Sequence, residues 1–249
     1  MITDLNISDA AIALLKRMIA IPSVSRDEGA VADMLEAYMR QESPVEVHRS
    51  GNNLWMVANG FNPARQTLLL NAHIDTVKPV ASWTRDPFHP TEEGDRIYGL
   101  GANDDGASVV SLLHTFLYVI GHEKLNYNLI FLASCEEEVS GKNGVSSVIG
   151  QLPKIDVALV GEPTGMNPNV AGGVRVAVAE KGLMVLDGTA LGKSGHAARN
   201  EGVNALYGAL DAIQTLRNYK FERESKTLGP VKVTTTVING GTAHNVIPD

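Results

Sequence analysis

The stretch Thr67-Leu68-Leu69-Leu70-Asn71-Ala72-His73-Ile74-Asp75 decides the fold, because an apolar run of strand length leads directly into a histidine and an aspartate. Two further apolar runs end in acidic residues, Asn128–Ala133 before Glu136–Glu138, and Asp156–Val160 before Glu162. A short continuous apolar run is typical of a strand that is buried on both faces. Helical patterns lie between these runs. The sequence therefore predicts an α/β fold whose mixed, largely parallel sheet is flanked by helices.

The composition is that of a folded protein with its own core. The 249 residues are 44% hydrophobic and 20% charged, and a chain of this size can bury about 70% of its extended surface. With 21 lysines and arginines against 28 aspartates and glutamates, the net charge is −7, so neither nucleic acid nor an anionic membrane is an expected partner. No segment reaches the roughly 18 apolar residues of a membrane span, and the one cysteine excludes an internal disulfide. We expect a cytoplasmic protein.

Helical periodicity covers the first 45 residues, where Ser25 and Glu28 have the spacing of a capping box. In such a box each side chain binds a free backbone N–H at the start of a helix. The pattern changes near Gly182. Beyond it, Met184–Ala190 and Val231–Ile238 are predicted as strands on either side of a helix from about Val203 to Tyr219. The sequence therefore predicts a small β-α-β unit after the larger α/β part.

The residues that can carry chemistry follow the predicted strands. They are His73, Asp75, Asp104, Glu137, Glu138 and Glu162. Ligands of open α/β sheets bind beyond the carboxyl ends of the strands, so we expect these side chains to lie together. Positions i and i+2 of a strand face the same way, so Asp75 can hold one nitrogen of His73 while the other binds a metal. One imidazole with several carboxylates and no thiolate suits zinc, cobalt or manganese.

Each of these residues also has a plainer interpretation when it is considered alone. Asp104 could cap the helix that follows it, and Glu136–Glu138 could be a solvated charged run. His73 could be a hydrogen-bonded histidine at a strand end, and Glu162 an ordinary loop acid. The combination favours a metal site, because carboxylates gathered at one edge of a sheet repel one another strongly unless a cation offsets their charge.

Six short motifs strengthen this interpretation. They are His73-Ile74-Asp75, Tyr98-Gly99-Leu100-Gly101-Ala102-Asn103-Asp104, Glu136-Glu137-Glu138, Gly161-Glu162-Pro163-Thr164, Gly195-His196-Ala197-Ala198 and Asn245-Val246-Ile247-Pro248. In this order the set resembles the dinuclear zinc hydrolase family of acetylornithine deacetylase, succinyl-diaminopimelate desuccinylase and carboxypeptidase G, with acetylornithine deacetylase the most similar branch. The resemblance implies a zinc-peptidase-like catalytic domain over residues 1–181. Residues 182–249 would belong to an inserted α+β lid or dimerisation domain.

The resemblance also implies a set of metal ligands for two divalent ions, zinc or else cobalt or manganese. Asp104 would bridge the two ions. His73 and Glu162 would complete the first site, and Glu138 would belong to the second. Asp75 would orient His73. The chain ends within the region that resembles the lid, so we expect the family's second histidine ligand to be absent and the second site to be incomplete.

The catalytic roles follow from the same resemblance. Glu137, directly before a metal-binding glutamate, would be the general base, and His196 of the lid would stabilise the oxyanion. Asn245 and Arg199 are candidate substrate contacts, although an exposed arginine is usually only solvated. The implied reaction is hydrolysis of the amide bond of an N-acyl amino acid, as in arginine biosynthesis, by a homodimer joined through the lid. The alternatives are a di- or tripeptidase or aminopeptidase with the same metals, and an inactive relative that only associates through its lid.

Overall fold

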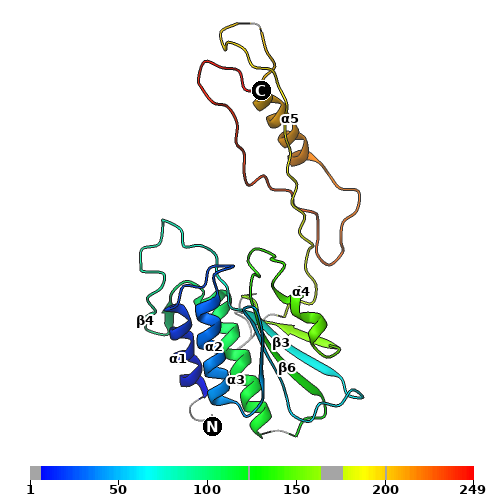
Figure 1. Ribbon diagram of the computed structural model, residues 1–249. Helices are drawn as coiled ribbons and strands as arrows, with labels where there is room; N and C mark the ends of the chain where they lie inside the picture. Colours follow the sequence, from blue (N-terminus) through cyan, green and yellow to red (C-terminus); the bar gives the residue numbers. More distant parts are fainter. Residues whose placement is uncertain (1–6, 123, 164–175, 200) are drawn as a thin grey trace. The chain divides into compact units, whose positions relative to one another are not determined.

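The computed structural model describes residues 7–122, 124–163, 176–199 and 201–249. The chain divides into two compact units, Met1–Gly165 and Met166–Asp249 (Figure 1). The resemblance places a boundary between a catalytic domain and a lid at residue 181. That boundary stays a prediction.

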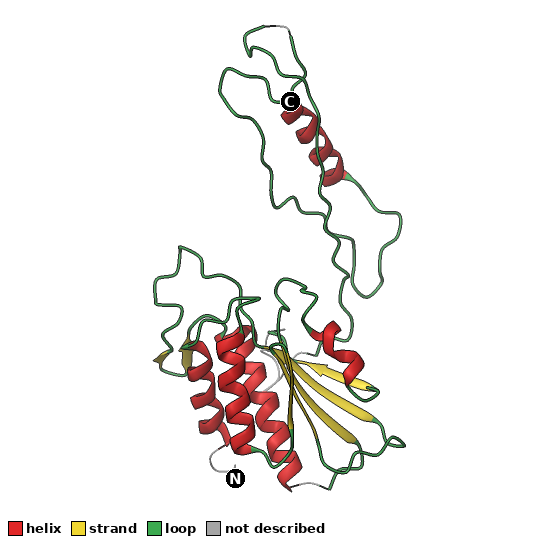
Figure 2. Ribbon diagram, in the orientation of Figure 1, coloured by secondary structure: helices red, strands yellow, loops and turns green. Residues whose placement is uncertain are grey.

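A five-stranded mixed sheet with the order β1-β2-β6-β3-β7 forms the centre of the first unit (Figure 2). Its strands are β1 Val47–Ser50, β2 Asn53–Val57, β3 Thr67–His73, β6 Asn128–Ser134 and β7 Val157–Val160. Strand β3 pairs parallel with β6 and β7, whereas β2 pairs antiparallel with β1 and β6. The predicted mixed sheet is confirmed, and the three apolar runs of the sequence form its parallel part.

The register of the parallel strands decides where the site lies. His73 pairs with Ser134 of β6, and Asn71 pairs with Val160 of β7. The three strands therefore end at nearly the same level, and the segments that follow them leave the sheet at one edge. Those segments carry Asp75, Glu136, Glu137, Glu138 and Glu162.

Three helices cover one face of the sheet and a short helix covers the other (Figure 1). They are α1 Ile7–Ile19, α2 Gly29–Glu42 and α3 Ala107–His122 on the first face, and α4 Val145–Val148 with the 3-10 turn Ile149–Gln151 on the second. Side chains alternate along β6, so Phe131 packs in the larger core beneath α2 and α3, while Ile130 and Leu132 pack with Val148. No described helix is long and apolar enough to cross a bilayer.

The connection between the sheet and α3 contains a second, two-stranded sheet. Strand β5 Arg96–Tyr98 pairs with β4 Thr91–Glu93 and not with the main sheet. The chain then enters a π-helical turn over Ala102–Gly106, in which Asp104 and Asp105 have non-helical φ and ψ and are joined by a cis peptide bond. Both aspartates contact His73 at the end of β3 before α3 begins.

The predicted capping box of Ser25 and Glu28 is wrong. Glu28 is the residue before α2, but its side chain caps no N–H of that helix. The Ser25 hydroxyl instead donates to Oδ2 of Asp75 at 2.7 Å, and Glu28 binds other partners, including the N–H of Glu136 at 3.2 Å. Partners that are distant in the sequence have displaced the local pairing that the spacing predicts.

In the second unit the predicted helix is present as α5 Ala205–Asn218. Its N-cap, Asn204, accepts the N–H of Leu206 through Oδ1 at 2.9 Å. The strands predicted over Met184–Ala190 and Val231–Ile238 are not formed, since neither segment belongs to a sheet. A strand needs a neighbour for its backbone hydrogen bonds and a cover for its apolar face, and these segments are largely exposed. The β-α-β prediction is therefore right for its helix and wrong for its strands.

Candidate metal centre

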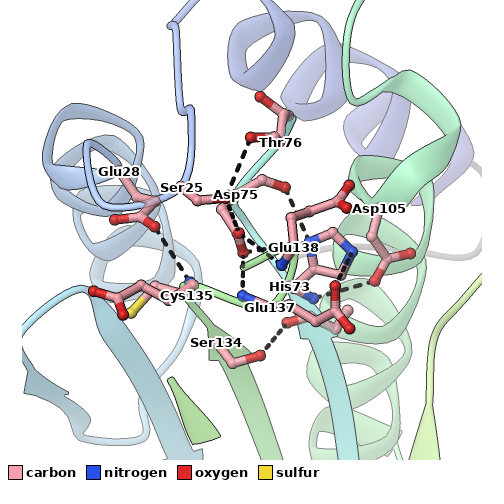
Figure 3. A network of polar contacts seen from close by, with 12 residues as sticks. Ser25, Glu28, His73, Asp75, Thr76, Asp105, Ser134, Cys135, Glu137 and Glu138 are labelled. Atoms are coloured by element: carbon pink, nitrogen blue, oxygen red, sulfur yellow. Dashed lines mark hydrogen bonds and ion pairs between the residues drawn. The ribbon is translucent and has the colours of Figure 1, made fainter. Parts of the chain in front are cut away.

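His73 is the centre of the site and is 2% exposed at the end of β3 (Figure 3). Its Nδ1 lies 2.9 Å from the carbonyl oxygen of Asp75 and 3.5 Å from that residue's Oδ1. Its Nε2 lies 3.1 Å from Oδ1 of Asp104 and 3.9 Å from Oε2 of Glu137. With Nδ1–H donated to the carbonyl of Asp75, Nε2 faces the carboxylates, which is the orientation in which a histidine binds a metal.

The carboxylate of Asp75 is buried and serves more than one neighbour (Figure 3). Besides the Ser25 hydroxyl, it accepts the N–H of Glu137 on Oδ1 at 3.0 Å and the N–H of Glu138 on Oδ2 at 3.1 Å. Burial would raise the pKa of Asp75, but His73, Ser25 and these two N–H groups hold the pKa below its ordinary value. One ionised carboxylate therefore orients the histidine segment and the acidic segment together.

Asp104 and Asp105 point in different directions from the break before α3. The side chain of Asp104 is about half exposed and reaches Nε2 of His73. Asp105 is buried, and its Oδ2 accepts the backbone N–H of His73 at 3.1 Å. Burial raises the pKa of the Asp105 carboxyl to about 7. Asp104 therefore offers a metal ligand, and Asp105 holds the backbone that presents His73.

The acidic triplet is not a solvated charged run. Glu136 is buried and has a φ of +55°, and its Oε1 accepts Nδ2–H of Asn143 at 2.6 Å. Its side chain therefore turns into the protein. Glu137 and Glu138 are exposed and partly exposed, and their side chains reach the site around His73. Of the three neighbouring glutamates, one is therefore bound to the protein and two can act as metal ligands.

Among the described residues, two groups of side chains offer ligand atoms that lie within 4.8 Å of one another in each group. They are His73, Asp104 and Glu138, and His73, Glu137 and Glu162. The structure thus brings together every predicted ligand, although it groups Glu138 rather than Glu162 with Asp104. Imidazole and carboxylate donors at this separation fit a divalent cation. The division of ligands between two ions stays a prediction.

The charges of the site also fit a cation. Burial raises the pKa of Glu138, and the Asp104 carboxylate raises it further. Burial raises the pKa of Glu162 as well, and the carboxylates of Glu137 and Asp104 add to the effect while His73 opposes it. Burial alone would lower the pKa of His73, but neighbouring carboxylates, with Asp75 first among them, raise it to about 10. The protein therefore gathers negative charge that a bound cation would offset.

The remaining predicted site residues, His196, Arg199 and Asn245, lie in the second unit. His196 pairs antiparallel with Val246, and the N–H of Ala197 donates to the carbonyl of Asn245 at 3.1 Å. Arg199 lies 3.9 Å from a carboxylate oxygen of Glu201 and lines a depression of about 710 Å³ within this unit. The two motifs that carry His196 and Asn245 are thus neighbours, and their catalytic and substrate-binding roles stay predictions.

Sequence reasoning missed several residues that hold the site. They are the buried Glu28 and Asp105, the partly buried Ser25 as a partner of Asp75, and the exposed Asn143. Only Asp105 had a signal, because it adjoins Asp104. Cys135 is buried, and burial raises the pKa of its thiol to about 11, far from the range of a reactive thiolate.

Comparison with known proteins identifies a protein family whose profile the chain matches. Residues 69–242 match the profile of peptidase family M20/M25/M40. The chain is 28% identical over 260 residues to a succinyl-diaminopimelate desuccinylase of Pelagibacter ubique, covering 95% of this chain and 65% of that protein. It is 32% identical over 225 residues to an acetylornithine deacetylase of Edwardsiella ictaluri, covering 83% and 56%. The chain thus spans less than two thirds of the length of these relatives.

The fold is shared with a solved structure. A dinuclear metal-binding peptidase of the M20 family from Bacillus subtilis aligns with a TM-score of 0.60 and 16% identity, over 99% of this chain and 62% of its own. At this identity the likeness concerns the fold, which matches a mixed sheet flanked by helices.

Proposed function

The chain belongs to peptidase family M20/M25/M40, as its six motifs predict, and from this premise we propose that it hydrolyses the amide bond of an N-acyl amino acid with two divalent metal ions. The observation that carries the proposal is the convergence of His73 with four carboxylates at one edge of the sheet. The names of both curated relatives specify removal of an acyl group, and the relative from Bacillus subtilis is a dinuclear metal-binding protein.

The ligands of the proposed centre are those that the structure gathers. Asp104 would bridge the ions, His73 and Glu162 would complete one site, and Glu138 would bind at the other. Zinc is the proposed metal, with cobalt or manganese as substitutes. Bound there, the two ions would polarise the amide carbonyl and lower the pKa of a water molecule.

Glu137 is the proposed general base. Its side chain is half exposed, so substrate and water can reach it, while the Asp75 carboxylate fixes its backbone N–H. Glu137 would take a proton from the attacking water and give it to the departing amine. Hydroxide adds to the carbonyl carbon and the C–N bond breaks, which yields a carboxylate and a free amino acid. His196 would stabilise the oxyanion, and Asn245 and Arg199 would contact the substrate.

The acyl group and the amino acid are the finer part of the proposal. The motifs favour acetylornithine and hence arginine biosynthesis, whereas most of the similar curated proteins are named desuccinylases, which favours lysine biosynthesis. We therefore propose both as candidate substrates. We also propose a cytoplasmic location. A homodimer through the second unit is proposed as well, because two extended apolar segments there have no strand partner among the described residues.

The test compares three substrates with zinc or cobalt added. N-acetylornithine, N-succinyl-diaminopimelate and a tripeptide are each supplied to the chain and to a Glu137→Gln variant, and release of the free amine is measured. We expect one acylated substrate to be cleaved and the variant to be at least about 100-fold slower, as loss of a general base predicts. Equal rates from both proteins would reject the proposal, and preference for the tripeptide would make the protein a peptidase.

Metal stoichiometry is a second test. In the described residues His73 supplies the only nitrogen ligand and belongs to both ligand groups. One imidazole cannot complete two sites, so we expect calorimetric titration of the metal-free chain with zinc to show one tight and one weak ion. Two sites of equal affinity would contradict this expectation.

A further inference from the structure

Glu28 is a carboxylate that the proposed reaction does not use, and yet it is 0% exposed. Its Oε1 accepts the backbone N–H of Arg26 at 2.6 Å and that of Glu136 at 3.2 Å. Its Oε2 accepts Nδ2–H of Asn52 at 3.0 Å. A buried carboxylate is retained in a protein only with such partners, and one of these partners lies 108 positions away in the chain (Figure 3).

The bond to Glu136 completes a pattern in the segment after β6. Three consecutive backbone N–H groups there are each accepted by a buried carboxylate. The N–H of Glu136 donates to Glu28, and those of Glu137 and Glu138 donate to the two oxygens of Asp75. Glu28 and Asp75, which lie far apart in the sequence, therefore set the backbone path of the segment that carries Glu137 and Glu138.

The backbone of Glu136 needs to be held. Its φ of +55° is uncommon for a residue with a side chain, and a chain without restraints would leave this region. Glu28 binds its N–H, and Asn143 binds its side chain at 2.6 Å. Both restraints turn the Glu136 side chain into the protein, so that the next two residues face His73.

We infer that Glu28 is a positioning residue of the metal centre: by binding the N–H of Glu136 it orients Glu137 and Glu138. The inference rests on the proposed function for its purpose, since it supposes that these two glutamates serve bound metal. The competing explanation is that Glu28 stabilises only the start of α2. That explanation predicts a loss of stability without any effect confined to the acidic segment.

The variants are chosen to separate these explanations. Glu28→Ala removes every bond of the carboxylate. Glu28→Gln keeps an oxygen for the two backbone N–H groups, and the Asn52 amide can turn to accept from the new Nε2–H, so this variant is the conservative rescue. Val31→Ala is the matched control, because Val31 is also 0% exposed in α2 and packs in the core. Glu28→Asp, which is one methylene shorter, is the second variant if Glu28→Ala does not fold.

The first measurement is amide hydrogen exchange of the metal-free chain, read by mass spectrometry on a peptide spanning Glu136–Glu138. We expect exchange in this peptide to be at least tenfold faster in Glu28→Ala and in Glu28→Asp. Glu28→Gln and Val31→Ala should exchange there as the unmodified chain does. An unchanged rate in the folded Glu28→Ala or Glu28→Asp variant would overturn the inference.

The second measurement is titration with Co²⁺, followed by visible absorption. Partners that orient ligands typically change metal affinity by about 10- to 100-fold, so we expect Glu28→Ala to bind Co²⁺ at least tenfold more weakly with an altered spectrum. Glu28→Gln and Val31→Ala should match the unmodified chain. If Glu28→Ala binds as tightly as the unmodified chain, the inference fails. If the unmodified chain binds no Co²⁺, the proposed function fails, and the exchange measurement decides the inference alone.

Discussion

The two units of the chain have similar apolar patterns but opposite burial. In the first unit Ile130 and Leu132 of β6 are fully buried between neighbouring strands. In the second unit Val185 lies in an equally apolar segment and is 75% exposed, and Ala205 is the one buried side chain among that unit's described residues. The difference lies in pairing, since β6 has a strand on each side and Met184–Ala190 has none. An apolar run becomes a strand only where it has neighbouring strands with which to pair.

The proposed functional residues of the two units differ in the same way. The proposed metal ligands lie in the first unit, where buried acids such as Asp75 and Asp105 fix the backbone that presents them. His196 and Asn245 lie on exposed segments of the second unit that are joined by isolated backbone bonds. Rigid support is what a metal site needs, because ligands must be held in place before the ion arrives. The first unit is therefore expected to bind metal without help from the second.

The largest expected effect comes from a pair of matched leucine substitutions. Leu132→Ala removes a fully buried side chain from β6 and should lower the free energy of unfolding by about 2–5 kcal/mol. Leu191→Ala changes a side chain that is 86% exposed in the second unit and should change that free energy by less than about 0.5 kcal/mol. Urea unfolding followed by circular dichroism measures both. Similar losses from the two variants would show that Leu191 is buried in solution, and the contrast between the units would fail.

A second pair of substitutions tests the division of chemistry. His73 belongs to both ligand groups, so His73→Ala should weaken Co²⁺ binding by 100-fold or more, which is about 2.7 kcal/mol. His196 belongs to neither group among the described residues, so His196→Ala should leave the affinity unchanged while it slows hydrolysis. Calorimetry and the amide assay separate the two effects. Weaker metal binding by a folded His196→Ala variant would contradict the separation.

Much of the first unit could be predicted from the sequence, because its strands are continuous apolar runs and its acids follow them. The antiparallel strands β1 and β2 were overlooked, although Gly51-Asn52 between Ser50 and Asn53 is a two-residue hairpin turn of a recognised kind. That signal was present in the sequence. The strands of the second unit were predicted wrongly for another reason: alternation within one segment carries no information about whether a partner strand exists.

The residues that hold the site show a further limit of sequence reasoning. Ser25 and Glu28 have the spacing of a capping box, and this local pattern is all that the sequence displays. In the structure the Asp75 carboxylate binds Ser25 and the N–H of Glu136 binds Glu28, across separations of 50 and 108 residues. Such partners become neighbours only through the fold, so local spacing cannot reveal them.

The smallest expected effect is a pH dependence that arises from packing in the first unit. His114 is buried in α3, where its Nδ1 lies 2.7 Å from the carbonyl of Val110 and its Nε2 lies 2.8 Å from the Tyr38 hydroxyl. The neutral ring satisfies both contacts, with Nδ1–H donated and Nε2 accepting. Burial lowers the pKa of His114, against smaller raising effects of the Val110 carbonyl and the Glu42 charge. The folded protein therefore resists protonation of this ring.

The sign of the effect follows from proton binding in the two states. As the pH falls below about 6.5, His114 takes up a proton in the unfolded chain but not in the folded chain. The free energy of unfolding therefore decreases until the pH passes the lowered pKa of the folded state. Each unit of lowering corresponds to about 1.4 kcal/mol. We expect the difference in unfolding free energy between the chain and a His114→Gln variant to shrink as the pH falls from 7 to 5. Subtracting the variant removes the acids of the metal centre, which titrate alike in both proteins. A difference that stays constant with pH would mean that His114 takes up its proton equally in the folded and unfolded chain, and that the core of the first unit admits more water than its packing indicates.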